Sequence, residues 1–181
     1  MPQDATGLLT CESVSARYGA RPVLDAVSVS FAPGRLTALM GPNGCGKSTL
    51  LKAIVGVLPC AGGRVTLDGL PLQTLPRRRL ARRLAWLPQE NQCPDHMSLG
   101  ELVALGGYAR ERFLRGPSAR DRRLFEDALR TVGLLALADR PVNTLSGGQR
   151  QRAWLAMILA QDTDVVLLDE PVNHLDLQYQ Y

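Results

Sequence analysis

Apolar and polar residues alternate over two stretches near the start of the chain, residues 8–19 and 22–34. Each stretch ends at glycine or proline, and this pattern predicts two half-buried strands. Residues 35–40 (RLTALM) are a shorter apolar run, which we expect to be a strand that leads into a glycine-rich turn. Apolar residues recur at helical spacing over residues 47–58, and residues 62–69 have the pattern of a further strand.

The second half of the chain has a different pattern. After a short basic helix, residues 84–89 (LAWLPQ) predict a strand, and residues 98–109 and 118–134 predict two helices. Ser118 and Asp121 have the spacing of a capping pair at the start of the second helix. Residues 146–161 predict a helix that two glycines open, and residues 165–170 (VVLLDE) a buried strand with acids at its end. We therefore expect one α/β domain over residues 1–181, with a core of residues 1–89 and 145–181 and a helical subdomain of residues 90–144.

Composition narrows the class of protein. The chain has 181 residues, of which 45% are hydrophobic and 21% charged, as in ordinary globular domains. A net charge of +4, concentrated in a few arginine clusters, does not indicate nucleic-acid binding. The four cysteines are widely spaced and predict reduced thiols in an intracellular protein. No signal peptide and no apolar run of about 20 residues is present, so we expect any membrane association to occur through a partner.

The stretch GPNGCGKSTLL, residues 41–51, matches the phosphate-binding loop pattern. Glycines let backbone N–H groups turn inward around a polyphosphate, and the following helix adds its positive dipole end. We expect Lys47 to reach the β- and γ-phosphates, Ser48 to help hold Mg2+, and Thr49 to lie near the α-phosphate. The predicted nucleotide-binding residues of this loop are Gly41, Asn43, Gly44, Gly46, Lys47, Ser48 and Thr49.

Two adjacent carboxylates follow the apolar run at residues 165–168. Asp169 is the expected Mg2+ ligand, directly or through water, as the usual partner of a P-loop serine. Glu170 is placed to polarise an attacking water as a general base. The alternative is an acidic turn after a core strand with no role in catalysis, and the P-loop in the same chain argues against it.

The sequence LSGGQ, Leu145 to Gln149, places a serine and two glycines at the start of a helix, and so predicts a second anion site. One chain rarely needs two γ-phosphate sites for one nucleotide, whereas two chains arranged head to tail do. At these motifs the chain resembles the ATP-binding cassette family. The resemblance implies a P-loop NTPase fold with antiparallel N-terminal strands, a mixed or parallel core sheet flanked by helices, and a helical insert. It also implies ATP and Mg2+ as ligands, with Ser146, Gly147, Gly148 and Gln149 contacting the nucleotide of a second, identical subunit.

Three further positions resemble family motifs. Tyr18 resembles the aromatic residue that stacks on adenine, although a tyrosine packed on the core is an alternative. Gln89, in LPQ, resembles the glutamine that contacts Mg2+ and the attacking water and senses the transmembrane partner. Asp176, in NHLD, resembles the acidic residue of a loop that crosses the dimer interface. His174 belongs to the same loop, so we do not expect it to bind metal.

The switch histidine of the family is missing, since the sequence stops before the strand that would carry it. We therefore expect a piece of a longer cassette. Expressed alone, this piece is expected to be marginally folded or aggregating and to lack ATPase activity.

Residues 18–34, 105–123 and 139–163 are similar to ATP-binding subunits of bacterial iron–siderophore importers, and haem and cobalamin importers share much of the pattern. Val172, where threonine is more frequent, is a departure beside the catalytic loop. The resemblance implies permease subunits, an indirectly associated periplasmic or lipoprotein substrate-binding protein, no nucleic-acid partner, and a peripheral location on the cytoplasmic face of the membrane. A soluble mechanical ATPase acting on ribosomes or DNA is the alternative. The compact insert between Lys47 and Ser146 argues against it, because chromosome-type relatives have a long coiled coil there and ribosome-acting relatives have two cassettes.

Two other features are ambiguous. The basic residues at 77–79, 82 and 83 suit anionic lipid or nucleic acid, but we favour a solvated helix face. Cys45 fits as a small loop residue whose thiol is open to alkylation.

Overall fold

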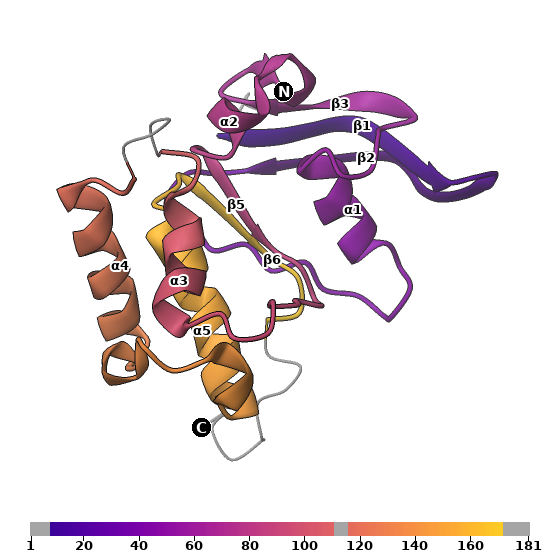
Figure 1. The fold of residues 1–181 in the computed structure, drawn as a ribbon. Coiled ribbons are helices and arrows are strands. Elements are labelled where there is room, and N and C mark those ends of the chain that lie inside the picture. The colour runs from indigo at the N-terminus through magenta and orange to yellow at the C-terminus, as the bar shows by residue number, and fades with distance from the viewer. Residues whose placement is uncertain (1–7, 111–115, 172–181) are drawn as a thin grey trace. The chain divides into compact units, whose positions relative to one another are not determined.

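The structure is a computed structural model that describes residues 8–110 and 116–171 (Figure 1). Its contacts group into two compact units, residues 1–80 and 81–181. The predicted helical subdomain at residues 90–144 belongs to the second unit, together with the last two strands. We describe each unit by itself.

A four-stranded antiparallel sheet forms the first unit, in the order β2-β1-β3-β4. Its strands are β1 (Leu9–Tyr18), β2 (Arg21–Phe31), β3 (Gly62–Leu67) and the short β4 (Leu70–Pro71). Helix α1 (Lys47–Ile54) packs on β1 and β2, and buries Leu50, Leu51 and Ile54. A 3-10 turn, η1 (Leu72–Thr74), and the single-turn helix α2 (Arg77–Leu80) follow. The predicted strands at residues 8–19, 22–34 and 62–69 and the helix after residue 47 are therefore confirmed.

The strand predicted at residues 35–40 is wrong in this structure. Leu36 is 99% exposed and Met40 is 90% exposed, and residues 35–40 pair with none of the described strands. An apolar run indicates that a segment is suited to burial, but a strand forms only where a neighbouring backbone supplies hydrogen bonds. The segment consequently enters the glycine-rich loop as irregular, largely exposed chain.

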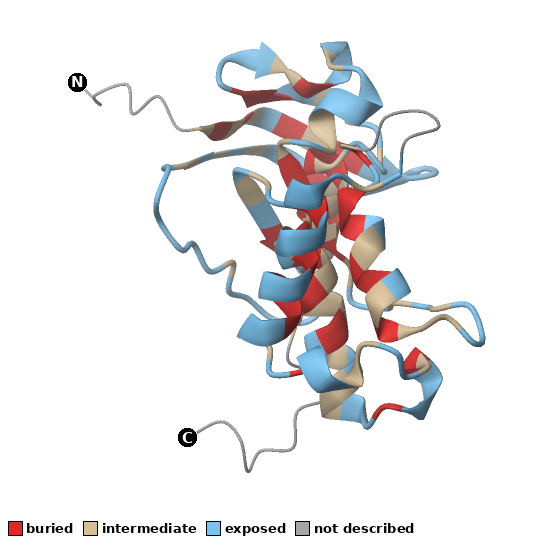
Figure 2. Cartoon of the chain, turned by 60° about the vertical axis from the view of Figure 1, so that its left-hand side comes forward, coloured by how far each residue is buried: buried red, intermediate tan, exposed pale blue. Residues whose placement is uncertain are grey.

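Three helices pack together in the second unit: α3 (Leu99–Ala104), α4 (Ala119–Thr131) and α5 (Gly147–Ala160). Short 3-10 turns connect or extend them: η2 (Leu105–Gly107), η3 (Leu135–Leu137) and η4 (Val142–Thr144). Their facing sides form one apolar core, and the buried positions line these helices in Figure 2. Its members include Leu99, Leu102, Val103, Phe125, Ala128, Leu129, Ala153 and Ala156. Ser118 and Asp121 form the predicted capping box at the start of α4.

A parallel pair of strands, β5 (Leu84–Leu87) and β6 (Val165–Leu168), completes this unit. Ala85 and Leu87 pack with Ile158 of α5. The prediction that residues 165–168 form a strand is confirmed, but the strand is less buried than its apolar pattern predicts, since Val166 is 45% exposed and Leu168 is 38% exposed. Among the described strands β6 pairs only with β5, so the alternating side chains on one face are left uncovered. Within the described residues, no helix has the length and apolar character needed to span a membrane.

Candidate functional site

The glycine-rich loop between residues 41 and 46 ends at the first residue of α1. Gly44 and Gly46 have φ angles of 81° and 101°, in the region that favours glycine. The space at residue 46 is also tight, since a Cβ atom there would lie 2.9 Å from Leu24 Cδ2 and the leucine side chain would have to move. The loop therefore reaches the helix start through glycines, whose conformation and lack of a side chain suit the close approach of a phosphate.

The ammonium group of Lys47 lies over its own loop. Its Nζ atom donates hydrogen bonds to the carbonyl oxygens of Gly41, at 2.9 Å, and Pro42, at 3.0 Å. A fixed cation, bare glycine backbone and the N-terminus of α1 all suit an anion with several oxygens. Ser48 and Thr49 lie in the first turn of the same helix, with Thr49 buried. The residues present thus fit a nucleotide polyphosphate.

Two candidate catalytic side chains meet at the ends of β5 and β6. The strands run in parallel and in register from Leu84 and Val165 to Leu87 and Leu168, so the residues that follow emerge at the same edge. Gln89 follows β5 by two residues and Glu170 follows β6 by two. The Gln89 side-chain amide donates a hydrogen bond of 2.7 Å to Glu170 Oε2. The structure therefore brings together two residues that lie 81 positions apart in the sequence.

The neighbouring carboxylate, Asp169, is only 4% exposed. Its backbone N–H donates to the carbonyl of Leu87 at 3.0 Å, which continues the strand ladder by one residue. Glu170 has a φ of 49°, a left-handed conformation that is unfavourable for a side chain of this size. Such strain persists only where the surroundings enforce it, and it is typical of functional sites. Carboxylate and amide oxygens are hard ligands, so Asp169 and Gln89 fit Mg2+.

The LSGGQ sequence forms the start of α5. Ser146 is the N-cap residue: its hydroxyl accepts a hydrogen bond from the Gln149 backbone, and the Gln149 side chain accepts one from the Ser146 backbone. Gly147 and Gly148 are the first two helical residues, and a Cβ atom at Gly147 would meet nothing within 4 Å. The helix start is therefore open to an approaching ligand.

The other predicted site residues lie at the end of β1 or outside the described residues. Tyr18 ends β1 and is 47% exposed, so its ring is not packed in the core as the alternative required. Asp176, His174 and Val172 lie outside the described residues. The P-loop residues and Tyr18 belong to the first unit, whereas Gln89, Asp169, Glu170 and the LSGGQ residues belong to the second. Their roles toward a nucleotide stay predictions.

The basic run at residues 77–83 differs from the expected solvated helix. Residues 77–79 are exposed on α2, as expected. Arg82, however, donates a hydrogen bond of 2.8 Å to the carbonyl of Ala109, and Arg83 pairs with Asp164. The helix ends at Leu80. Arg82 and Arg83, just before β5, therefore contact other parts of the second unit.

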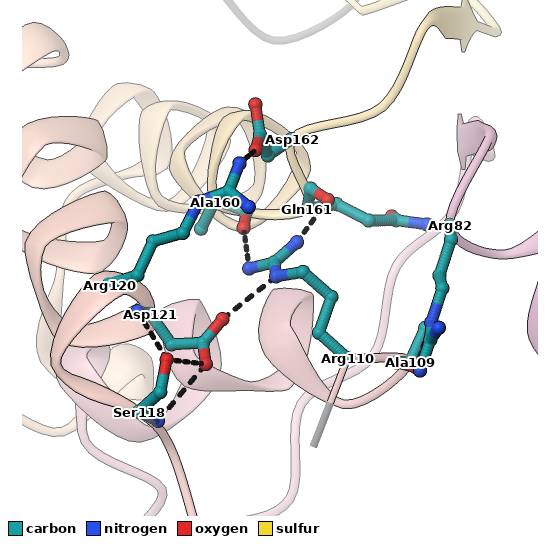
Figure 3. Close-up of polar contacts among 9 residues, drawn as sticks. All are labelled: Arg82, Ala109, Arg110, Ser118, Arg120, Asp121, Ala160, Gln161 and Asp162. Carbon is teal, nitrogen blue, oxygen red and sulfur yellow. Dashed lines mark hydrogen bonds and ion pairs between the residues drawn. The ribbon is translucent and has the colours of Figure 1, made fainter. Parts of the chain in front are cut away.

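Sequence reasoning missed one buried cluster, which Figure 3 shows. Arg110, 17% exposed, pairs with Asp121 at 2.8 Å and also reaches backbone carbonyls at the end of α5. Burial opposes ionisation of Asp121, but hydrogen bonds from Ser118 and the neighbouring Arg110 outweigh it and lower the pKa of this carboxyl. Asp121 was predicted only as a capping residue, and no motif marked Arg110.

Comparisons with known proteins agree with the motifs. Residues 24–173 match the family model for ABC transporters. The chain is 41% identical over 172 residues to a siderophore transport system ATP-binding protein of Bacillus subtilis, covering 95% of this chain and 62% of that protein. It is 40% identical over 177 residues to the ferric enterobactin transport ATP-binding protein of Escherichia coli, covering 98% of this chain and 65% of that protein.

A solved structure gives the same picture. The fold is similar to that of a metal-chelate type ABC transporter in an inward-facing conformation, with a TM-score of 0.79 and 28% identity, over 96% of this chain and 63% of that one. The chain thus spans less than two thirds of the length of these relatives. Since the family model covers most of the sequence, the chain belongs to the ABC transporter family.

Proposed function

We propose that this chain is part of the ATP-hydrolysing subunit of a bacterial importer that takes up ferric siderophores. The contact of Gln89 with Glu170 carries the proposal, because it joins the two side chains expected to act on the attacking water. The siderophore and enterobactin transport functions of the two relatives support the choice of cargo.

The P-loop binds and orients the nucleotide in this proposal. Lys47 exchanges its two carbonyl acceptors for β- and γ-phosphate oxygens, and the loop N–H groups donate to the same phosphates. The ring of Tyr18 stacks on adenine. Ser48, Gln89 and Asp169 hold Mg2+, which when bound neutralises charge on the phosphate oxygens.

Glu170 acts as the general base. Its carboxylate accepts a proton from the water whose oxygen attacks the γ-phosphorus, while the bond between that phosphorus and the bridging oxygen of ADP breaks. The hydrogen bond from Gln89 fixes the orientation of the carboxylate in advance. Because Gln89 lies on the segment after β5, a movement of that segment changes the orientation of the Glu170 carboxylate. This gives the permease a route to control hydrolysis.

The LSGGQ segment completes the site of a second subunit. The exposed start of α5 offers Ser146, Gly147, Gly148 and Gln149 to the γ-phosphate bound by the partner, so two subunits pair head to tail with two nucleotides between them. Asp176 belongs to the loop expected at the same interface. The assembled subunits bind permease proteins at the cytoplasmic face of the membrane, and a substrate-binding protein delivers the cargo from outside.

A pair of variants in the full-length protein tests this function. Glu170→Gln keeps the shape of the side chain but removes the base, so the variant should bind ATP and accumulate as an ATP-bound dimer on size-exclusion chromatography. Lys47→Ala is the matched control, since it should lose ATP binding by calorimetry and should not dimerise. Hydrolysis by Glu170→Gln at the wild-type rate would refute the role of Glu170, and unchanged ATP affinity of Lys47→Ala would refute the P-loop assignment.

A further inference from the structure

A partly buried guanidinium group lies at the C-terminal end of α5. Arg110 Nε donates to Asp121 Oδ1 at 2.8 Å, Nη2 donates to the carbonyl of Ala160 at 2.7 Å, and Nη1 donates to the carbonyl of Gln161 (Figure 3). The last carbonyls of a helix lack partners within the helix and carry its negative dipole end. Arg110 therefore caps α5 and at the same time fixes its end to the start of α4.

The contacts continue from this point to strand β5. The Gln161 side-chain amide donates to the carbonyls of Ala81, at 2.8 Å, and Leu84, at 3.2 Å. Arg82 Nε returns to the carbonyl of Ala109, the residue before Arg110. These hydrogen bonds form a closed ring that we call the Arg110 junction, made of Ala81, Arg82, Leu84, Ala109, Arg110, Asp121, Ala160 and Gln161.

The junction is better suited to setting positions than to adding stability. Helices α3, α4 and α5 and the turns between them already share an apolar core, whereas a largely desolvated ion pair repays little more than its own desolvation. The guanidinium is planar and its donors have fixed directions, so it accepts only a narrow range of orientations between α5, α4 and the strand. The ring consequently fixes the angle between α5 and strand β5 at the point where the end of α5 meets the start of β5.

A small error in that angle becomes large at the other end of the helix. Helix α5 has 14 residues, which at 1.5 Å per residue gives a length of about 21 Å. A tilt of about 3° at the junction would move the LSGGQ segment by about 1 Å over that length. A misplacement of about 1 Å costs roughly 100-fold in rate where reacting groups must be aligned.

We infer that Arg110 is a positioning residue for ATP hydrolysis. It holds α5 so that the LSGGQ segment at one end and the Gln89 and Glu170 side chains beyond β5 and β6 keep a fixed relation to each other. The inference rests on the proposed function, since it requires that the LSGGQ segment contacts the nucleotide of the partner subunit. It assigns to Arg110 an effect on turnover and none on the binding of ATP to a single subunit, because no residue of the junction is among those proposed to hold the nucleotide or Mg2+.

Two substitutions in the full-length subunit, assembled with its permease, test the inference. Arg110→Met removes all the donors at similar volume, and Arg110→Lys keeps the charge but cannot reach three acceptors at once. We expect kcat to fall roughly 10- to 100-fold in Arg110→Met, with the Kd of the isolated subunit for ATP unchanged. Arg110→Lys should recover much of the thermal stability that Arg110→Met loses, yet little of its kcat.

Arg120→Gln is the matched control. It removes an ion pair with Asp162 that lies beside the same turn but is open to solvent, with side chains 74% and 42% exposed. Its kcat and its melting temperature should equal those of the wild type.

Three results separate the alternatives. If Arg110→Met melts earlier but retains wild-type kcat well below its transition, the junction is only structural and the inference is overturned. Wild-type kcat in Arg110→Lys would overturn it too, because charge alone would then suffice. Gly147→Asp tests the proposed function separately: wild-type hydrolysis in that variant would show that LSGGQ does not meet a γ-phosphate, whatever the Arg110 variants do.

Discussion

Gly106 is the middle residue of η2 and lies against the C-terminal end of α5, and replacing it with alanine should destabilise the second unit. A Cβ atom at this residue would lie 2.4 Å from the carbonyl oxygen of Met157, 3.0 Å from the backbone nitrogen of Gln161 and 3.2 Å from the backbone carbon of Ala160. All three atoms belong to the backbone, so no side chain can rotate out of the way. Ordinary contact begins at 3.4 Å, and η2 and α5 would have to separate by 1.0 Å, the difference between 3.4 and 2.4 Å.

The cost follows from this overlap. Overpacking of a close-packed contact costs about 1–3 kcal/mol. At about 2–4 °C per kcal/mol for a domain of this size, the melting temperature of Gly106→Ala should fall by about 2–12 °C. Thermal unfolding followed by circular dichroism measures the change, and urea unfolding gives the free energy independently.

Gly147→Ala provides the control. It makes the same chemical change within the same unit, but its Cβ atom would meet nothing within 4 Å and its φ is not positive. Its stability should equal that of the wild type or exceed it slightly, since alanine favours helix. Equal melting temperatures for the two variants would refute the close approach of η2 and α5.

Two predictions concern titratable groups. N-ethylmaleimide should modify the exposed Cys45 first and abolish ATP binding. It should spare Cys11, because burial and the neighbouring Cys60 raise the pKa of that thiol to about 11. Mass spectrometry of partly labelled protein checks the order of labelling, and earlier labelling of Cys11 would contradict the prediction. The lowered pKa of Asp121 contributes stability that is fully present above the ordinary carboxyl value of 3.8 and is lost as the pH falls through the lowered pKa. The stability difference between wild type and Asp121→Asn, measured by thermal unfolding, should therefore shrink as the solution is acidified below about pH 4, and a difference that grows there would disprove the pairing.

Local signals predicted most of the elements and the chemical motifs. The capping box of Ser118 and Asp121 and the helix start at Ser146 involve residues three positions apart, so the sequence displays them directly. Gln89 and Glu170 were predicted as site residues from their motifs alone, but the hydrogen bond between them depends on the pairing of β5 with β6. Their role in catalysis stays a prediction.

Features that depend on distant parts of the chain were not predictable in this way. Residues 35–40 are apolar enough for a strand, yet strand formation depends on a neighbour that the pattern does not specify. Arg110 has its acceptors 11, 50 and 51 residues away, and nothing around it in the sequence distinguishes it from a surface arginine. Long-range polar contacts of this kind follow from the packing of the helices, which the hydrophobic pattern determines only approximately.

The hydrogen bonds of Lys47 to Gly41 and Pro42 have a consequence for repeated turnover. Both acceptors lie within the loop itself, so the ammonium acts as an internal template that keeps the loop curved around a positive centre. In the proposed function, the lysine can return to these carbonyls when product leaves, so its ammonium keeps two acceptors in the nucleotide-free loop. We expect the next nucleotide to meet a loop that is already curved and to replace the two carbonyl acceptors with phosphate oxygens.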